Sequence, residues 1–330
     1  MTRRFSPYLS GHYTSLKPFL KSMKIVTLTL NPALDKSAKV DNLTPENKLH
    51  CHSITYKPGG GGINVSRILK RLGIESSCIF PSGGETGSFL EELILNEDIN
   101  LKTIPVSEKT RENLSVLDTQ TGLQYRFGIP GAELLTKELI AIQTTVDHII
   151  DDNYILVLSG SLPQNAPSDF YAQIIQSVSK YNVKIILDTS GEALKKTIDE
   201  NLYLLKPNQN ELAKLAGKDF LTSAEQEAFV TELIQTKNIK YIVVSMGARG
   251  AFLASKKGIH YQSTPSVMVK STIGAGDSML AGLIYGIQNE LHEKKMLRWG
   301  VACGTATTMS DGTALASLKN IEIINGMMHK

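Results

Sequence analysis

The chain has 330 residues, of which 42% are hydrophobic and 20% are charged, and its 35 basic and 32 acidic residues leave a net charge of +3. This composition suits one large domain with a sizeable core and excludes a disordered chain. No basic run stands out, which argues against nucleic acid as a partner. Three widely spaced cysteines without a CxxC pair argue against a zinc site, and we expect them to be small buried residues of a cytoplasmic protein.

Residues 1–22 carry four basic residues and no acidic one. They lack the apolar core of a secretory signal, and no apolar run in the chain approaches the ~20 residues of a membrane-spanning helix. A clear strand pattern begins only after Met23. We therefore expect a disordered N-terminal extension over residues 1–22, followed by one domain over residues 23–330.

The first expected strand is the β-rich run at residues 24–30, which ends at Asn31-Pro32. Asp35 follows directly, where open α/β sheets place their ligands, although a surface aspartate is an equal alternative. Residues 36–57 then alternate in short stretches, and residues 110–130 have the pattern of a hairpin. We expect these two segments to form a small sheet that covers a site as a lid or pairs with its twin in a dimer.

Four consecutive glycines, Gly59 to Gly62, directly precede a strongly periodic helical segment that ends at Gly73. Core packing does not explain this run, so we expect something to approach its backbone closely. A sugar ring fits that description. A flexible loop is the alternative.

Strand and helix patterns alternate through the middle of the chain, and each apolar strand ends in polar and glycine residues. This repetition predicts a doubly wound, mostly parallel sheet flanked by helices, with one ligand-binding edge. The four strands are expected at residues 154–158, 183–187, 202–205 and 241–244.

The stretch from Ser271 to Ser278 leads into another amphipathic helical pattern. The first N–H groups of a helix have no intrahelical partner, so Gly274, Ala275 and Gly276 are suited to cradle an anion. Asp277 would then be placed to deprotonate a hydroxyl that attacks a phosphoryl group. The alternative is an aspartate N-cap after a tight glycine turn.

The presence or absence of other motifs limits the classes of enzyme to which the chain can belong. Neither GxxxxGK[ST] nor GxGxxG occurs, which argues against P-loop kinases and Rossmann dehydrogenases. Ser159-Gly160-Ser161 fails the GxSxG pattern of hydrolases. His292-Glu293 lacks a second histidine at zinc spacing and is expected on a solvated helix face. Residues 206–211 offer oxygen ligands for Mg²⁺ beside a lysine, although an ordinary helix N-terminus is equally compatible.

The chain carries an ordered set of motifs: NPALD (31–35), PGGGGINVSR (58–67), TREN (110–113), SGSLP (159–163), KPNQNE (206–211), SMGARG (245–250) and GAGD (274–277). From about Met23 to its end the chain resembles the ribokinase-like PfkB sugar kinases. Within that family it is most similar to the minor-type ATP-dependent 6-phosphofructokinases. The ordered set is far more specific than any single motif.

This resemblance implies that Asp277 is the general base and that Gly274, Ala275 and Gly276 form the anion hole. The sugar hydroxyls would be held by Asp35, Asn64 and the backbone of Gly60 and Gly61. The phosphate of the sugar would be bound by Arg111, Lys48 and, as a weaker candidate, Arg126.

For the nucleotide, the resemblance implies that Glu211 and Asn208 organise Mg²⁺ through water. The ATP phosphates would lie along Lys206, Ser245, Gly247 and Gly250. Some relatives also hold a monovalent cation such as K⁺ with backbone carbonyls, here around Ser271, Ile273 and Gly312.

Two departures bear on the substrate. Relatives that act on tagatose 6-phosphate or fructose 1-phosphate usually have GGKG, whereas this chain has four glycines, which favours fructose 6-phosphate. His50 stands where the minor 6-phosphofructokinases often have arginine, so one charge at the phosphate or dimer contact is altered.

The expected activity is transfer of the ATP γ-phosphate to the C1 hydroxyl of fructose 6-phosphate in glycolysis, by a homodimer joined through the lid. The alternatives are a tagatose-6-phosphate kinase or 1-phosphofructokinase of the same family, a non-catalytic sugar-phosphate-binding protein, and a nucleoside kinase.

Overall fold

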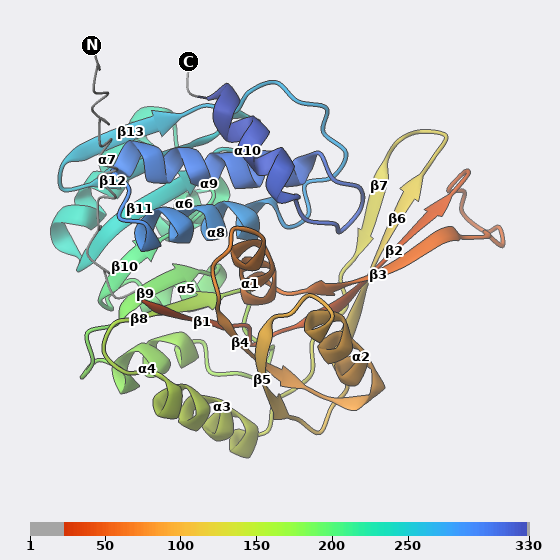
Figure 1. Cartoon of the computed structure of the whole chain (residues 1–330), viewed down its shortest axis with the longest axis horizontal. Helices are drawn as coiled ribbons and strands as arrows, with labels where there is room; N and C mark the ends of the chain where they lie inside the picture. Colours follow the sequence, from red (N-terminus) through yellow and green to blue (C-terminus); the bar gives the residue numbers. More distant parts are fainter. Residues whose placement is uncertain (1–22, 329–330) are drawn as a thin grey trace, which may run out of the picture.

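Two sheets organise the chain, and the larger has nine strands (Figure 1). The computed structural model describes residues 23–328, so the extension expected at 1–22 lies outside the described residues. All neighbours in the large sheet are parallel except β12 and β13, which join one edge in antiparallel pairs. The strand order is β13 (Gly258–Gln262), β12 (Ala251–Ser255), β11 (Ile239–Ser245), β10 (Leu202–Leu205), β9 (Lys184–Asp188), β8 (Tyr154–Ser159), β1 (Lys24–Leu28), β4 (Ser77–Ser82), β5 (Asn100–Pro105).

Helices cover both faces of this sheet, because the central strands bury apolar side chains on alternate sides. Leu156 and Leu158 of β8 belong to one cluster, while Ile155 and Val157 belong to the other. On one face lie α3 (Thr136–Ile149), α4 (Phe170–Ser177), α5 (Gly191–Thr197), α6 (Gln209–Leu215) and α7 (Ser223–Thr236). On the other lie α1 (Gly61–Arg71), α2 (Gly84–Leu95), α8 (Ala275–Gln288), α9 (Glu293–Thr308) and α10 (Leu318–Met327). The predicted doubly wound fold is confirmed.

The smaller sheet projects to one side of the molecule (Figure 1). Its order is β3 (His52–Gly59), β2 (Ala33–Val40), β6 (Arg111–Asp118), β7 (Gln124–Phe127), with β2 and β6 parallel and both outer pairs antiparallel. The prediction of a small second sheet is confirmed. Asp35 lies within β2 of this sheet rather than in a loop directly after β1.

Two local predictions are wrong. Cys51 is exposed, whereas Cys78 and Cys303 are buried as expected. His292 is exposed as expected, but Glu293 is buried, and its carboxylate lies 3.4 Å from His260 and 3.6 Å from Lys257. A separate observation is that no helix within residues 23–328 has both the length and the apolarity needed to cross a membrane.

The helix that carries Asp277 is held by very close packing against α9. A Cβ built on Gly282 of α8 would lie 2.4 Å from the Trp299 carbonyl oxygen and 2.8 Å from Cys303 Sγ. Backbone atoms cannot yield as a flexible side chain can. Glycine at this position therefore sets how closely the two helices approach.

We predict that Gly282→Ala lowers the free energy of unfolding by about 1–3 kcal/mol, because the added methyl forces α8 and α9 apart. Gly326→Ala is the matched control, since it is also helical, has open space within 4 Å of where an added Cβ would lie and removes the entropic disadvantage of glycine. The control should be neutral or slightly stabilised in urea unfolding. Equal stability of the two variants would contradict this account of the α8–α9 contact.

Candidate active site

The carboxyl ends of the parallel strands meet at one edge of the large sheet, and the predicted site residues gather there. β8 ends at Ser159, β9 at Asp188 and β11 at Ser245, while Lys206 directly follows β10. The N-termini of α1, α6 and α8 lie at the same edge of the large sheet. The topology thus brings together residues that are far apart in the sequence.

Helix α8 begins at the glycine-rich turn in the way needed to expose its first N–H groups. Gly274 is the N-cap and has a left-handed φ of 72°. A Cβ there would also lie 2.5 Å from Leu315 Cδ2, so both the left-handed φ and the packing favour glycine. Asp277 is the third helical residue, and the alternative that it is merely the N-cap is wrong. The Ala275 N–H donates a long hydrogen bond of 3.4 Å to the Thr272 carbonyl, and the helix dipole makes this end of α8 suited to an anion.

The Asp277 carboxylate is held by Asn64 of α1, whose amide donates a hydrogen bond of 2.9 Å to Oδ2. Desolvation and the negative charge of Asp188 raise the pKa of Asp277 to about 6. The hydrogen bond from Asn64 and the charge of Lys206 oppose that rise. A carboxylate with a pKa near 6 is a competent proton acceptor at neutral pH.

The four-glycine run lies at the start of α1, and its close neighbours are protein atoms. Added Cβ atoms would meet Asp35 at Gly59, Thr29 at Gly60 and Gly62, and Ser159 at Gly61, all within 2.3–2.7 Å. The expectation of close approach is confirmed, but the statement that packing does not explain the run is wrong. The start of α1 therefore packs closely against the ends of β1 and β8.

Lys206 is 4% exposed and forms an ion pair of 3.0 Å with Asp188. Its Nζ lies 3.5 Å from the Cβ position of Gly276, so its positive charge adjoins the start of α8. Asp188 is a site residue that no motif in the sequence singles out. The one signal for it is an acidic residue at the end of an apolar strand, at the ligand-binding edge.

Asn208 and Glu211 form a reciprocal capping box at the start of α6. Asn208 Oδ1 accepts from the Glu211 N–H at 2.9 Å, and Glu211 Oε2 accepts from the Asn208 N–H at 2.8 Å. The helix-cap alternative for residues 206–211 therefore describes the local structure. Burial and the charge of Asp188 raise the pKa of Glu211, although the hydrogen bond from the Asn208 N–H opposes this.

The remaining predicted nucleotide residues lie beside α6. Asn208 pairs with Ser245 through a parallel β-bridge, and the Ser245 N–H donates to the Pro207 carbonyl at 3.0 Å. Gly247 is the first residue of the short 3₁₀ helix at Gly247–Arg249 and Gly250 directly follows it, with φ values of 61° and 94°. This segment forms one margin of the site.

The small sheet adds a pocket of about 280 Å³ on its polar side. Asp35 lies in its wall and accepts a hydrogen bond of 2.9 Å from Asn113, its cross-strand neighbour. Burial raises the pKa of Asp35, while Asn113 and Arg111 oppose the rise. The pocket is lined by Asp35, Lys36, Arg111, Asn113, Leu114, Ser115, Arg126, Phe127, Gly128, Ile273 and Thr313.

The three predicted phosphate-binding cations lie in different settings. Arg111 lines the pocket but donates three hydrogen bonds to backbone carbonyls, those of Asn31, Pro32 and Ile129. Arg126 also lines it and donates to Thr272 at 2.9 Å. Lys48 is exposed in the connection between β2 and β3. Arg111 and Arg126 are thus together, and Lys48 is not in this pocket.

The loop before α8 and the loop after α9 both contact the small sheet. Ser271 donates to Gln124 at 3.4 Å, and Ser37 lies 3.3 Å from Thr313. Gly312, the residue before Thr313, has a φ of 58°. The candidate carbonyls for a monovalent cation, on Ser271, Ile273 and Gly312, therefore lie on loops that both border the sheet.

Comparison with known proteins agrees with this arrangement. The sequence pattern of the pfkB family carbohydrate kinases matches residues 28–320. The ATP-dependent 6-phosphofructokinase isozyme 2 of Escherichia coli strain K12 is 37% identical over 296 residues, covering 89% of this chain and 96% of that protein. The 1-phosphofructokinase of Bacillus subtilis strain 168 is 31% identical over 287 residues, covering 87% and 93%.

Solved structures give the same result. Phosphofructokinase-2 from Escherichia coli in complex with fructose-6-phosphate has a TM-score of 0.88 and 35% identity, covering 93% of this chain and 100% of that chain. The same enzyme in complex with potassium has a TM-score of 0.89 and 36% identity, with the same coverage.

The raised pKa of Asp277 makes stability depend on pH. Between the ordinary value of 3.8 and the folded value of about 6, the native state binds more protons than the unfolded state. Stability must therefore fall as pH rises through this window. Because the carboxyl keeps some access to solvent, we expect its ionisation to cost about 2 kcal/mol.

We predict that Asp277→Asn removes this dependence and gains about 2 kcal/mol relative to wild type between pH 4 and pH 7. Urea unfolding across that range measures the difference. Asp98→Asn, at an exposed position outside the site, should follow the wild-type curve. Parallel curves for wild type and Asp277→Asn would show that burial does not disfavour the charged carboxylate.

Proposed function

The chain belongs to the PfkB family of carbohydrate kinases, and we propose that it is an ATP-dependent 6-phosphofructokinase. It transfers the γ-phosphoryl group of ATP to the C1 hydroxyl of fructose 6-phosphate and forms fructose 1,6-bisphosphate and ADP. The observation that carries this proposal is the position of Asp277. It lies in the first turn of α8, and its carboxylate accepts a hydrogen bond of 2.9 Å from the Asn64 amide.

In the proposed mechanism, Asp277 accepts the proton of the C1 hydroxyl while the oxygen attacks the γ-phosphorus. The bond from the γ-phosphorus to the bridging oxygen of ADP breaks. The N–H groups of Gly274, Ala275 and Gly276 and the ammonium of Lys206 stabilise the charge that develops on the transferring group. This catalysis depends on positioning and electrostatics.

The nucleotide is proposed to lie along Lys206, Ser245, Gly247 and Gly250, with Mg²⁺ near Glu211 and Asn208. The raised pKa of Glu211 fits this assignment, because a nearby cation would favour its charged form. Within residues 23–328 no group of three acidic, histidine or cysteine side chains could hold a metal alone. Mg²⁺ would therefore depend on nucleotide oxygens and water, and it would neutralise phosphate charge.

Fructose 6-phosphate is proposed to occupy the pocket beneath the small sheet. Asp35 and Asn64, with the Gly60 and Gly61 backbone, would bind its hydroxyls. Arg111 retains two of its five N–H groups beyond the three hydrogen bonds to carbonyls, and these would bind the 6-phosphate with Arg126. The carbonyl bonds hold the guanidinium in place, which reduces the entropy lost on binding.

Lys48 is proposed as a further phosphate contact, and its exposed position suits a role at a contact between subunits. A monovalent cation such as K⁺ is proposed at the carbonyls of Ser271, Ile273 and Gly312. We also propose that the enzyme acts in glycolysis in the cytoplasm.

A 1-phosphofructokinase or tagatose-6-phosphate kinase is the second candidate, since one relative at 31% identity is a 1-phosphofructokinase. The four glycines at 59–62, without the lysine of GGKG, favour fructose 6-phosphate. The remaining rival is a sugar-phosphate-binding protein without turnover. Against it stands the intact arrangement of Gly274 to Asp277 with Asn64 and Lys206.

We predict that coupled ADP-release assays give the highest kcat/KM with fructose 6-phosphate among that sugar, fructose 1-phosphate and tagatose 6-phosphate. Asp277→Asn should lower kcat by about 10²–10⁴-fold with little change in ATP binding, because it removes the proton acceptor but keeps the shape. Absence of turnover in wild type with all three sugars would reject the kinase assignment, and preference for another sugar would reject only the substrate.

A homodimer joined through the small sheet is proposed from its outward apolar side chains. Tyr125 and Phe127 alternate with the inward Arg126 on β7 and are 38% and 49% exposed, and Phe127 also borders the pocket. Ile54 on β3 is 49% exposed. Exposed apolar side chains that gather on one sheet are a common mark of an interface.

We predict that Tyr125→Glu shifts the protein to a monomer in analytical ultracentrifugation, because the charge would be buried without a partner and Tyr125 does not line the pocket. Phe220→Glu is the control; Phe220 is 73% exposed and lies after α6, away from the small sheet. The control should leave the dimer intact. A wild-type protein that is monomeric at all concentrations tested would contradict the proposed dimer.

A further inference from the structure

Arg67 is the largest fully buried side chain in the described part of the chain, and no step of the proposed reaction uses it. It lies on α1, one turn after Asn64, and is 1% exposed. Burying a guanidinium costs free energy unless hydrogen-bond acceptors and a negative charge surround it. Its contacts therefore indicate what it does.

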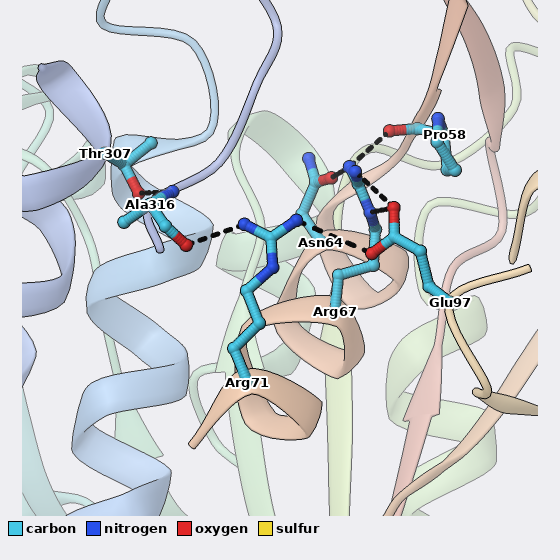
Figure 2. Close-up of polar contacts among 7 residues, drawn as sticks. All are labelled: Pro58, Asn64, Arg67, Arg71, Glu97, Thr307 and Ala316. Carbon is cyan, nitrogen blue, oxygen red and sulfur yellow. Dashed lines mark hydrogen bonds and ion pairs between the residues drawn. The ribbon is translucent and has the colours of Figure 1, made fainter. Parts of the chain in front are cut away.

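Figure 2 shows that Arg67 is fixed from three sides. Its Nε and Nη2 donate to Glu97 Oε1 at 2.9 and 2.7 Å, and its Nη1 donates to the Pro58 carbonyl at 3.0 Å. The same Nη1 donates to Asn64 Oδ1 at 3.2 Å. Burial would raise the pKa of Glu97, but hydrogen bonds and charge from Arg67 and Arg71 bring it below its usual value.

The contact with Asn64 fixes the orientation of that amide. Arginine has only donors, so the amide must turn its oxygen toward Arg67. Its NH₂ group then faces the other way and donates to Asp277 Oδ2 at 2.9 Å. If the amide turned over, its oxygen would face the carboxylate, and only a protonated carboxyl could donate to it.

We propose that Arg67, held by Glu97, is a positioning residue that fixes the Asn64 amide with its donor end on Asp277. This inference rests on the proposed function, because it gives Asp277 the role of proton acceptor. Arg67 does not touch the reacting atoms. It acts by keeping the acceptor ionised and by holding the carboxylate in one orientation.

Other charges also act on Asp277. Asp188 and Asp35 raise its pKa and Lys206 lowers it, while Lys206 is itself influenced by Glu211. Substituting Arg67 leaves Asp188, Lys206 and Glu211 in place, but Arg67 also lowers the pKa of Asp35, so its loss can reach Asp277 by that second route. The Asn64→Ala background described below separates a shift that passes through Asn64 from one that passes through Asp35.

Arg71 provides a matched control on the same helix. It approaches Glu97 Oε2 at 3.5 Å and donates to the Ala316 carbonyl at 2.6 Å. The Ala316 N–H in turn donates to Thr307 Oγ1 (Figure 2). Arg71 shares the carboxylate partner of Arg67 but makes no contact with Asn64 in the described structure.

The test is a titration of the Asp277 carboxyl by ¹³C NMR in the full chain, which requires no turnover. We expect Arg67→Met to raise the pKa of Asp277 by about 1, since one hydrogen bond to the charged form is lost. The acid limb of kcat against pH should move up equally, with ATP binding unchanged. Arg71→Met should leave both unchanged.

A double-mutant cycle identifies the route. In an Asn64→Ala background, Arg67→Met should shift the pKa no further. A folded Arg67→Met protein with a wild-type pKa, an equal shift in Arg71→Met, or a full shift in the Asn64→Ala background would each overturn the proposal. If Arg67→Met does not fold, Glu97→Gln decides, with a smaller shift in the same direction expected and no shift contradicting it.

Failure of the proposed function gives a different result. A wild-type protein that does not phosphorylate any of the three sugars would reject that function, while the NMR titration would still report whether Arg67 acts on Asp277 through Asn64.

Discussion

The hydrogen bond from Asn64 to Asp277 joins the first turns of two helices that are 213 residues apart. Each helix starts at the carboxyl edge of the large sheet, and glycines set both positions. Gly61 and Gly62 bring α1 against the strand ends, while Gly274 and Gly282 bring α8 against Leu315 and α9. The site geometry thus depends on close packing of backbone, which tolerates little change in volume.

Side chains of the small sheet point alternately to its two faces, and each face has its own proposed role. Asp35 pairs with Asn113 and Ser115 pairs with Arg126, which places these polar residues on the side of the pocket. Val116 pairs with Tyr125, which places the aromatic ring on the opposite side. A slip of one residue would exchange the two surfaces, so the register of this sheet fixes the pocket and the proposed interface together.

Much of the fold was predictable because the parallel strands are buried on both sides. Continuous apolar runs located β8, β9, β10 and β11 to within two residues. Strands β4, β5, β12 and β13 were not identified. Strands β5 and β13 are partly exposed and lack such runs, whereas β4 and β12 are buried and were missed although they are apolar. In the site, Asp277 and Asn64 are recognisable because ordered motifs surround them. Arg67 is not, because a helical arginine in sequence resembles a solvated residue, and its burial depends on Glu97, 30 residues further along the chain. Contacts of this kind exist only after the helices pack.

The charges of the site explain why its carboxylates need hydrogen bonds that hold them in place. Burial raises the pKa of Asp35, Glu211 and Asp277, so three carboxylates at one edge are ionised at a cost in stability. The core clusters on both faces of the large sheet offset that cost. Because each of these carboxylates is unfavourable alone, its orientation must be fixed by hydrogen bonds from Asn64, Asn113 and Asn208. A neutral amide or backbone N–H can donate to a carboxylate without adding a competing positive charge. The cationic groups Lys206 and Arg111 are held by Asp188 and by three backbone carbonyls, and they adjoin the start of α8 and the pocket where phosphate groups are proposed to bind.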